Sequence, residues 1–139
     1  MEFIKTAVKG ATVHVIDDNV PLARAFGKAL SLAGYRVAIS HDAVSALEEV
    51  QRLLPEAIVL DVEMPFVNGV GFLYRIRAMK PLHDTPVIVV TGQALNGETQ
   101  AEIRNLGAQL LKKPLAIGDL VTAVRASLDA RAGRGPGDD

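Results

Sequence analysis

The chain has 139 residues, of which 49% are hydrophobic and 22% charged, and it contains no cysteine. This size and balance fit one globular domain, and the absence of cysteine excludes disulfides, thiolate metal sites and cysteine nucleophiles. With 15 Lys and Arg against 16 Asp and Glu, the net charge of −1 argues against direct nucleic-acid binding. The N-terminus has no signal-peptide pattern and the apolar runs are too short to span a bilayer, so we expect a cytoplasmic protein without a membrane partner.

Short apolar runs alternate with helical periods along the chain. The runs are β-branched or aliphatic and mostly lack polar alternation, which is typical of a parallel sheet covered on both faces. Together they predict five βα units and a doubly wound α/β fold. In chain order the predicted elements are strand Thr12–Ile16, helix Leu22–Ala33, strand Arg36–Ser40, helix Ala43–Leu54, strand Ala57–Leu60, helix Phe72–Met79, strand Val87–Val90, helix Ala101–Leu106, strand Gln109–Lys112 and helix Ile117–Leu128.

Short flanking segments complete the predicted domain organisation. Residues 1–10 are predicted to be an N-terminal extension, 11–131 the domain itself, and the glycine-rich residues 132–139 a flexible tail or linker stub. Gly34 and Gly107 follow two of the predicted helices, where a residue in the left-handed conformation commonly ends a helix.

Carboxylate, hydroxyl or ammonium side chains follow four of the five predicted strands. In an open parallel sheet ligands bind beyond the carboxyl ends of the strands, so these side chains should meet at one edge. Converging carboxylates raise one another's pKa and persist most easily around a hard divalent cation such as Mg²⁺. With a lysine and a hydroxyl beside them they describe a phosphoryl site in which Asp61 is the candidate acceptor. The residues are Asp17, Asp18, Asp61, Thr91 and Lys113.

Four sequence fragments carry a family resemblance: VHVIDDN, IVLDVEMPFVNG, VIVVTG and GAQLLKKP. In this order and at these spacings, they resemble the receiver domain of bacterial two-component response regulators, the CheY-like family, from about Thr12 to about Leu128. The resemblance implies a flavodoxin-like (βα)5 fold with a five-stranded parallel sheet in the order 2-1-3-4-5. It also implies a phosphoprotein of a phosphorelay: a signalling switch that catalyses its own phosphorylation and slow autodephosphorylation, and not an enzyme with multiple turnover.

The resemblance also implies site roles and partners. A sensor histidine kinase or histidine phosphotransfer protein would donate the phosphoryl group to Asp61, which Thr91 and Lys113 would contact. Asp18 would ligate Mg²⁺ (or Mn²⁺) directly together with Asp61, Asp17 would act through water, and the backbone carbonyl of Glu63 would be a further ligand. The Lys113–Pro114 bond would be cis. Homodimerisation, common in the family, would use the predicted elements around Ala101–Leu106, Gln109–Lys112 and Ile117–Leu128.

Four positions depart from the family pattern or vary within it. Leu110 stands where many members carry an aromatic switch residue, so we expect a smaller rearrangement of that strand on phosphorylation. Glu63 and Gln93 occupy positions that tune the lifetime of the aspartyl phosphate in the family, and Gly92, where alanine is common, keeps phosphoryl access open.

Alternative interpretations remain open for single residues and for the whole chain. Asp17 and Asp18 could be helix-capping acids, although an adjacent pair exceeds what capping requires. His14 reads as a hydrogen-bonded strand histidine, and Gly69-Val70-Gly71 lacks the third glycine of a dinucleotide site, so no further cofactor is expected. The rival functions are a phosphorylation-independent interaction module and, less favoured, an aspartate-nucleophile phosphatase.

Overall fold

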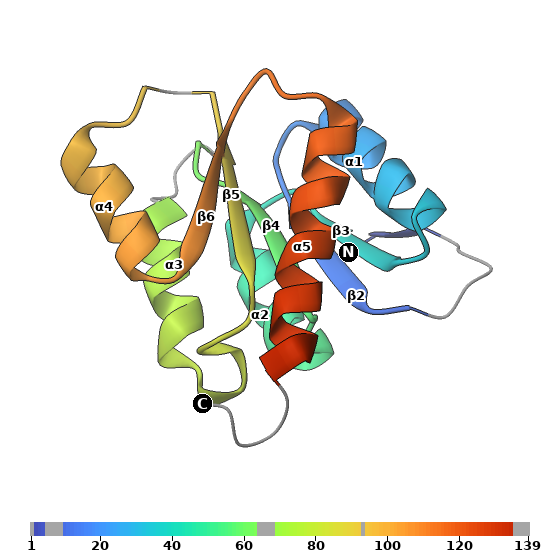
Figure 1. Cartoon of the computed structure of the whole chain (residues 1–139), viewed down its shortest axis with the longest axis horizontal. Coiled ribbons are helices and arrows are strands. Elements are labelled where there is room, and N and C mark those ends of the chain that lie inside the picture. The colour runs from blue at the N-terminus through green and yellow to red at the C-terminus, as the bar shows by residue number, and fades with distance from the viewer. Residues whose placement is uncertain (1, 5–9, 64–68, 93, 135–139) are drawn as a thin grey trace.

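A single sheet with helices on both faces forms the core of the molecule (Figure 1). The computed structural model describes residues 2–4, 10–63, 69–92 and 94–134. Its elements are β1 (Glu2–Ile4), β2 (Thr12–Ile16), α1 (Val20–Leu32), β3 (Arg36–Ser40), α2 (Ala43–Leu53), β4 (Ala57–Asp61), α3 (Gly69–Ala78), a 3₁₀ turn (Lys80–Leu82), β5 (Val87–Thr91), α4 (Gly97–Asn105), β6 (Ala108–Lys112) and α5 (Ile117–Arg134).

The five predicted strands are confirmed as a parallel array. They lie in the order β3-β2-β4-β5-β6, which is the predicted order 2-1-3-4-5 once they are counted without β1. Every residue of β4 and β5 is buried, in agreement with central strands covered on both faces.

The prediction of a five-stranded, wholly parallel sheet is incomplete, because β1 adds a sixth strand. This strand lies in the segment predicted only as an extension and pairs antiparallel with β3, with Glu2 opposite Ile39 and Ile4 opposite Val37. Three residues are too short to show a periodic pattern, so their pairing depends on the edge that β3 offers them.

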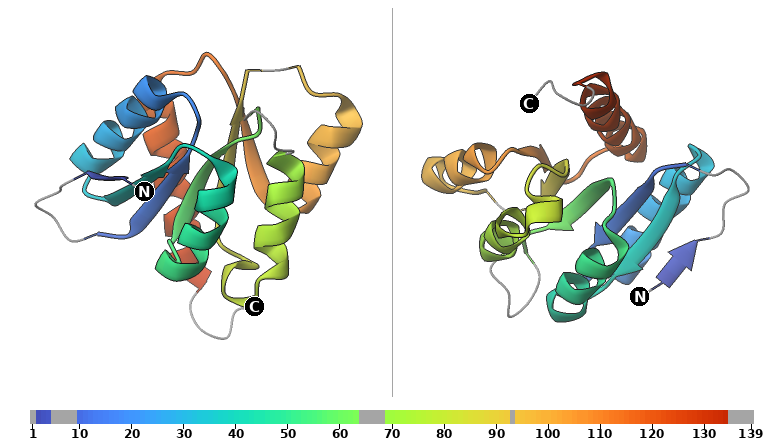
Figure 2. Two further views of the ribbon diagram at one scale, coloured as in Figure 1. Left: turned by 180° about the vertical axis from the view of Figure 1, so that it is seen from behind. Right: turned by 90° about the horizontal axis from the view of Figure 1, so that it is seen from below.

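Helices lie on both faces of the sheet (Figure 2), and a cluster of apolar side chains lies between the helices and each face. On one face α1 and α5 cover a cluster that includes Val15, Phe26 and Leu120. On the other, α2, α3 and α4 cover a cluster that includes Ile16, Leu73 and Ile103. The alternation of neighbouring strand residues such as Val15 and Ile16 between the two clusters follows from the two-residue period of a strand.

Local signals set where the helices begin and end. Asn19, Asp42 and Asn96 cap α1, α2 and α4 by accepting hydrogen bonds from backbone N–H groups. Gly34 and Gly107 adopt positive φ values of 102° and 76°, which confirms their predicted conformation. The last helix reaches Arg134 and thus extends into the predicted tail. Within the described ranges, no helix is both long and apolar enough to cross a bilayer.

Candidate functional site

Three carboxylates meet where β2 and β4 end. Asp17 and Asp61 are 2% and 4% exposed, whereas Asp18 projects to the surface. One carboxylate oxygen from each lies within 4.8 Å of the others. Because the side chain of Asn19 caps α1, helix capping does not account for the acidic pair.

Lys113 brings a positive charge to the same edge from the loop after β6. Its Nζ lies 3.4 Å from Oδ2 of Asp17 and 3.7 Å from Oδ2 of Asp61, and its backbone N–H donates to the carbonyl of Thr91 at 2.8 Å. The Lys113–Pro114 bond is cis, as predicted. The neighbouring Lys112 is exposed, so only the second lysine of the pair joins the carboxylates.

The acceptor candidate Asp61 holds its proton more tightly than an ordinary aspartate. Burial raises its pKa to about 6, and the Asp17 carboxylate adds to the rise, while the backbone N–H of Glu63 and the ammonium of Lys113 oppose it. That N–H donates to Oδ1 of Asp61 at 2.9 Å. The predicted mutual repulsion of the acids thus acts on Asp61, but loss of hydration is the larger cause.

The carboxylate of Glu63 lies beside Thr91, the residue predicted to contact the phosphoryl group. The hydroxyl of Thr91 donates to Oε1 of Glu63 at 2.6 Å, and a Cβ atom placed on Gly92 would lie 3.3 Å from the same oxygen. Glycine at 92 therefore leaves room for this carboxylate, a reason additional to phosphoryl access. Gln93 and residues 64–68 lie outside the described residues, so the predicted role of Gln93 stays a prediction.

The oxygen donors at this edge fit a hard divalent cation. Three carboxylates supply them, two of these are buried, and Lys113 offers one positive charge against three negative ones. Among the described residues no other group of three or more acids and histidines meets at such short range. The donor set is therefore suited to Mg²⁺ or Mn²⁺ rather than to a soft metal.

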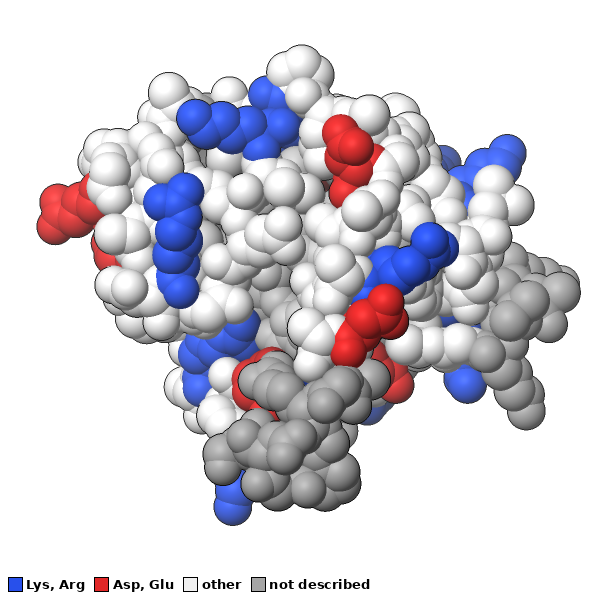
Figure 3. Space-filling view, in the orientation of Figure 1, with Lys and Arg blue, Asp and Glu red and all other residues white. Residues whose placement is uncertain are grey.

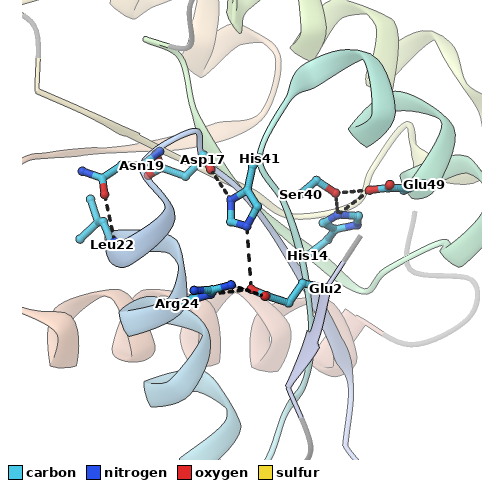
Figure 4. A network of polar contacts seen from close by, with 9 residues as sticks. All are labelled: Glu2, His14, Asp17, Asn19, Leu22, Arg24, Ser40, His41 and Glu49. Carbon is cyan, nitrogen blue, oxygen red and sulfur yellow. Dashed lines mark hydrogen bonds and ion pairs between the residues drawn. The ribbon is translucent and has the colours of Figure 1, made fainter.

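The three histidines lie in three different settings. His14 is fully buried, its Nε2 lies 2.6 Å from Oγ of Ser40, and Ser40 in turn donates to Glu49 (Figure 4). Its interpretation as a hydrogen-bonded strand residue is confirmed, and burial lowers its pKa to about 4. His41 contacts the backbone of Asp17, and the exposed His83 contacts the carbonyl of Lys80.

A hollow of about 460 Å³ opens beside Lys113. Helix α1 forms one wall and the loop between β6 and α5 forms the other, so the hollow adjoins the acidic edge of the sheet. It is lined by Leu22, Phe26, Gly92, Lys113, Pro114 and Leu115.

The fold and this site together define a class of protein. Its members are α/β domains of five βα units that carry an acidic pair, a further aspartate, a threonine and a lysine at one edge of the sheet. The family model of the response regulator receiver domain matches residues 13–125. The chain belongs to this family, whose members act as switches in two-component signalling.

Relatives and solved structures agree with this assignment. The chain is 32% identical over 126 residues to the transcriptional regulatory protein PrrA of Mycobacterium tuberculosis, covering 91% of this chain and 53% of the relative. It is 34% identical over 116 residues to the response regulator MprA of Mycobacterium leprae, covering 84% and 50%. The chain thus spans about half the length of these curated relatives.

The solved structures show the same fold. A CheY-like receiver domain protein from Methanospirillum hungatei superposes with a TM-score of 0.83 at 24% identity, covering 93% of this chain and 100% of that one. The chemotaxis protein CheY4 of Vibrio cholerae superposes with a TM-score of 0.77 at 27% identity, covering 84% and 98%.

Proposed function

We propose that this chain is a phospho-accepting receiver in which Asp61 takes a phosphoryl group from a phosphohistidine in a Mg²⁺-dependent reaction. The observation that carries the proposal is the position of Asp61, beside both the ammonium of Lys113 and the acidic pair Asp17 and Asp18. A family member that only bound partners would have no need to keep three carboxylates and a lysine together at this edge.

Each side chain has a part in the transfer. An oxygen of Asp61 attacks phosphorus, the P–N bond to the donor histidine breaks, and its electron pair stays on the imidazole nitrogen. Lys113 pairs with the phosphoryl oxygens, and Thr91 donates its hydroxyl to one of them once it has left Glu63. A cation held by Asp18, Asp61 and the carbonyl of Glu63, with Asp17 acting through water, would neutralise charge on the phosphoryl group. The transfer itself leaves a charge of about −1.5 to −2 at the end of β4.

The partner surfaces follow from the surroundings of the site. The hollow between α1 and the β6–α5 loop adjoins Lys113, and we infer that the donor kinase or phosphotransfer protein docks there. Basic and acidic side chains are interspersed over the described part of the face in Figure 3, which is consistent with a protein partner rather than nucleic acid. Homodimerisation through α4, β6 and α5 stays a prediction.

The test is phosphorylation of the chain by a phosphohistidine donor in the presence of Mg²⁺. We expect acid-stable labelling that hydroxylamine removes, as an acyl phosphate requires, and loss of label in Asp61→Asn and with EDTA. Asp84→Asn, at an exposed acid before β5, is the matched control and should label normally. Undiminished, hydroxylamine-resistant labelling of Asp61→Asn would refute the proposal, and a wild-type chain that takes no label would favour the phosphorylation-independent module.

A further inference from the structure

The peptide groups on both sides of Asp17 are held by the end of the neighbouring strand β3 and by His41, the residue that follows it. The N–H of Asp17 donates to the carbonyl of Ser40 at 3.1 Å, and Nδ1 of His41 lies 3.1 Å from the carbonyl oxygen of Asp17. Because a carbonyl only accepts, Nδ1 carries the proton of this hydrogen bond. The peptide is planar, so fixing this carbonyl restricts the direction of both aspartate side chains.

The same imidazole ring is bounded on its other side by the N-terminal strand. Nε2 of His41 lies 3.8 Å from Oε1 of Glu2 in β1. Glu2 is held in turn by Arg24 of α1, whose Nε and Nη2 donate to its two oxygens at 3.1 and 2.8 Å. Figure 4 shows His41 between Asp17 and Glu2, with Arg24 beside the Glu2 carboxylate.

These contacts connect β1, through Glu2 and His41, to the backbone of Asp17 at the acidic edge of the sheet. The side chains of His41 and Glu2 are 31% and 33% exposed, so the ring is packed rather than free to rotate in solvent. We propose that Glu2 and His41 are positioning residues that hold the Asp17–Asp18 peptide in the orientation needed to bind a divalent cation. This inference rests on the proposed function, because it takes the acidic cluster to be the cation site.

The first experiment needs no metal. The amide nitrogen of Asp18 belongs to the peptide whose carbonyl His41 contacts, so its NMR chemical shift reports that hydrogen bond in metal-free protein. We expect a shift change at Asp18 in His41→Ala, a smaller one in Glu2→Ala, and a near-normal shift in His41→Asn, whose side-chain amide can replace Nδ1–H. His83→Ala and Glu48→Ala, at exposed positions, are the controls and should leave the Asp18 amide unchanged.

The second experiment measures Mg²⁺ affinity by calorimetry on the same variants, with thermal unfolding recorded to confirm that each is folded. Loss of a group that orients ligands typically weakens metal binding by about tenfold or more. We expect about this loss in His41→Ala, substantial recovery in His41→Asn, an intermediate value in Glu2→Ala, and wild-type affinity in both controls.

Asp18→Asn distinguishes failure of the proposed cation site from failure of the positioning role of Glu2 and His41. If the wild-type chain binds no Mg²⁺, or binds it unchanged in Asp18→Asn, the proposed cation site itself fails and the inference fails with it. If Asp18→Asn loses Mg²⁺ while folded His41→Ala and Glu2→Ala bind as tightly as wild type, only the positioning role is overturned. Should His41→Ala not fold, wild-type affinity in Glu2→Ala together with an unmoved Asp18 amide would overturn it equally.

Discussion

The hydroxyl of Thr91 donates a 2.6 Å hydrogen bond to the carboxylate of Glu63. The same hydroxyl is the proposed contact of the phosphoryl group, so the two anions compete for one donor. Phosphorylation of Asp61 would therefore release Thr91 from Glu63. This change of hydrogen-bond partner is a local structural difference between the phosphorylated and unphosphorylated states.

The first prediction concerns this competition. Glu63→Gln removes a negative charge that repels the incoming phosphoryl group, and relief of about 1 kcal/mol of repulsion corresponds to about fivefold in rate. We expect phosphorylation of Glu63→Gln by a small-molecule phosphodonor to be about fivefold faster, as followed by stopped-flow or mass spectrometry. Glu48→Gln on α2 is the charge-matched control, and an unchanged or slower rate in Glu63→Gln would contradict the prediction.

The second prediction follows from the raised pKa of Asp61, about 6 against an ordinary value of 3.8. The folded state favours the protonated acid, so this contribution to stability is present below pH 3.8 and is lost as the pH rises through 6. In metal-free buffer, Asp61→Asn should therefore be more stable than wild type at pH 7, by at most about 3 kcal/mol, and lose this advantage near pH 4.

Urea unfolding at several pH values measures this difference. Added Mg²⁺ should stabilise wild type more than Asp61→Asn, because the cation offsets the repulsion that the variant lacks. A variant less stable than wild type at pH 7, or an advantage independent of pH, would count against the burial of an ionised Asp61.

The third prediction has the opposite sign with pH. Burial lowers the pKa of His14 to about 4 from 6.5, so the neutral ring contributes stability above pH 6.5 that is lost as the pH falls toward 4, by about 3 kcal/mol. His14→Gln keeps an N–H for Ser40 but cannot titrate, so its unfolding free energy should fall less on acidification. His83→Gln, at an exposed ring, should follow wild type. Equal acid sensitivity in His14→Gln and wild type would show that another group is responsible.

Most of the fold could be predicted because the hydrophobic pattern of short segments indicates where strands and helices form. The runs Thr12–Ile16 and Arg36–Ser40 have the bounds that the structure shows, since a strand covered on both faces consists largely of apolar residues. β1 could not be predicted, because its pairing depends on the edge of β3 rather than on its own three residues.

The site was predictable to a similar degree. The carboxylates and Lys113 follow strand ends, and parallel topology alone brings strand ends together. The partners of Thr91 and His41 were not predictable, because they depend on side-chain orientations of residues far apart in the sequence. Glycine at 92 was the one signal for the first of them, since it removes the Cβ that would crowd Glu63.

The fourth prediction concerns Gly69, the first residue of α3. A Cβ there would lie 2.4 Å from the backbone Cα of Val62, next to the acceptor, and backbone atoms cannot give way cheaply. Gly69→Ala should destabilise the chain by about 2 kcal/mol or more and shift the amide resonances around Asp61. Gly97→Ala, where no atom lies within 4 Å of the added carbon, should be neutral or slightly stabilising. Similar unfolding free energies for the two variants would contradict this close approach.

The fifth prediction concerns Leu110, the predicted switch position. It pairs with Val89 in the sheet and packs, partly buried, against the cluster under α2, α3 and α4. A side chain already packed there, with no ring to turn and no hydroxyl, should move little. On binding the phosphoryl mimic beryllofluoride with Mg²⁺, amide shift changes should be larger at Thr91 than at Leu110. Dominant changes around Leu110 would contradict this.

The short strand β1 also determines which edge of the sheet is exposed to solvent. It hydrogen-bonds along Val37–Ile39, so the outer edge of β3 cannot recruit a strand from a second molecule. The edge left open on this side is three residues long instead of five, and short edges are one way in which sheets avoid intermolecular pairing and aggregation. A fragment begun at residue 11 would keep every parallel strand and yet uncover that longer edge, so its solubility should suffer before its fold does.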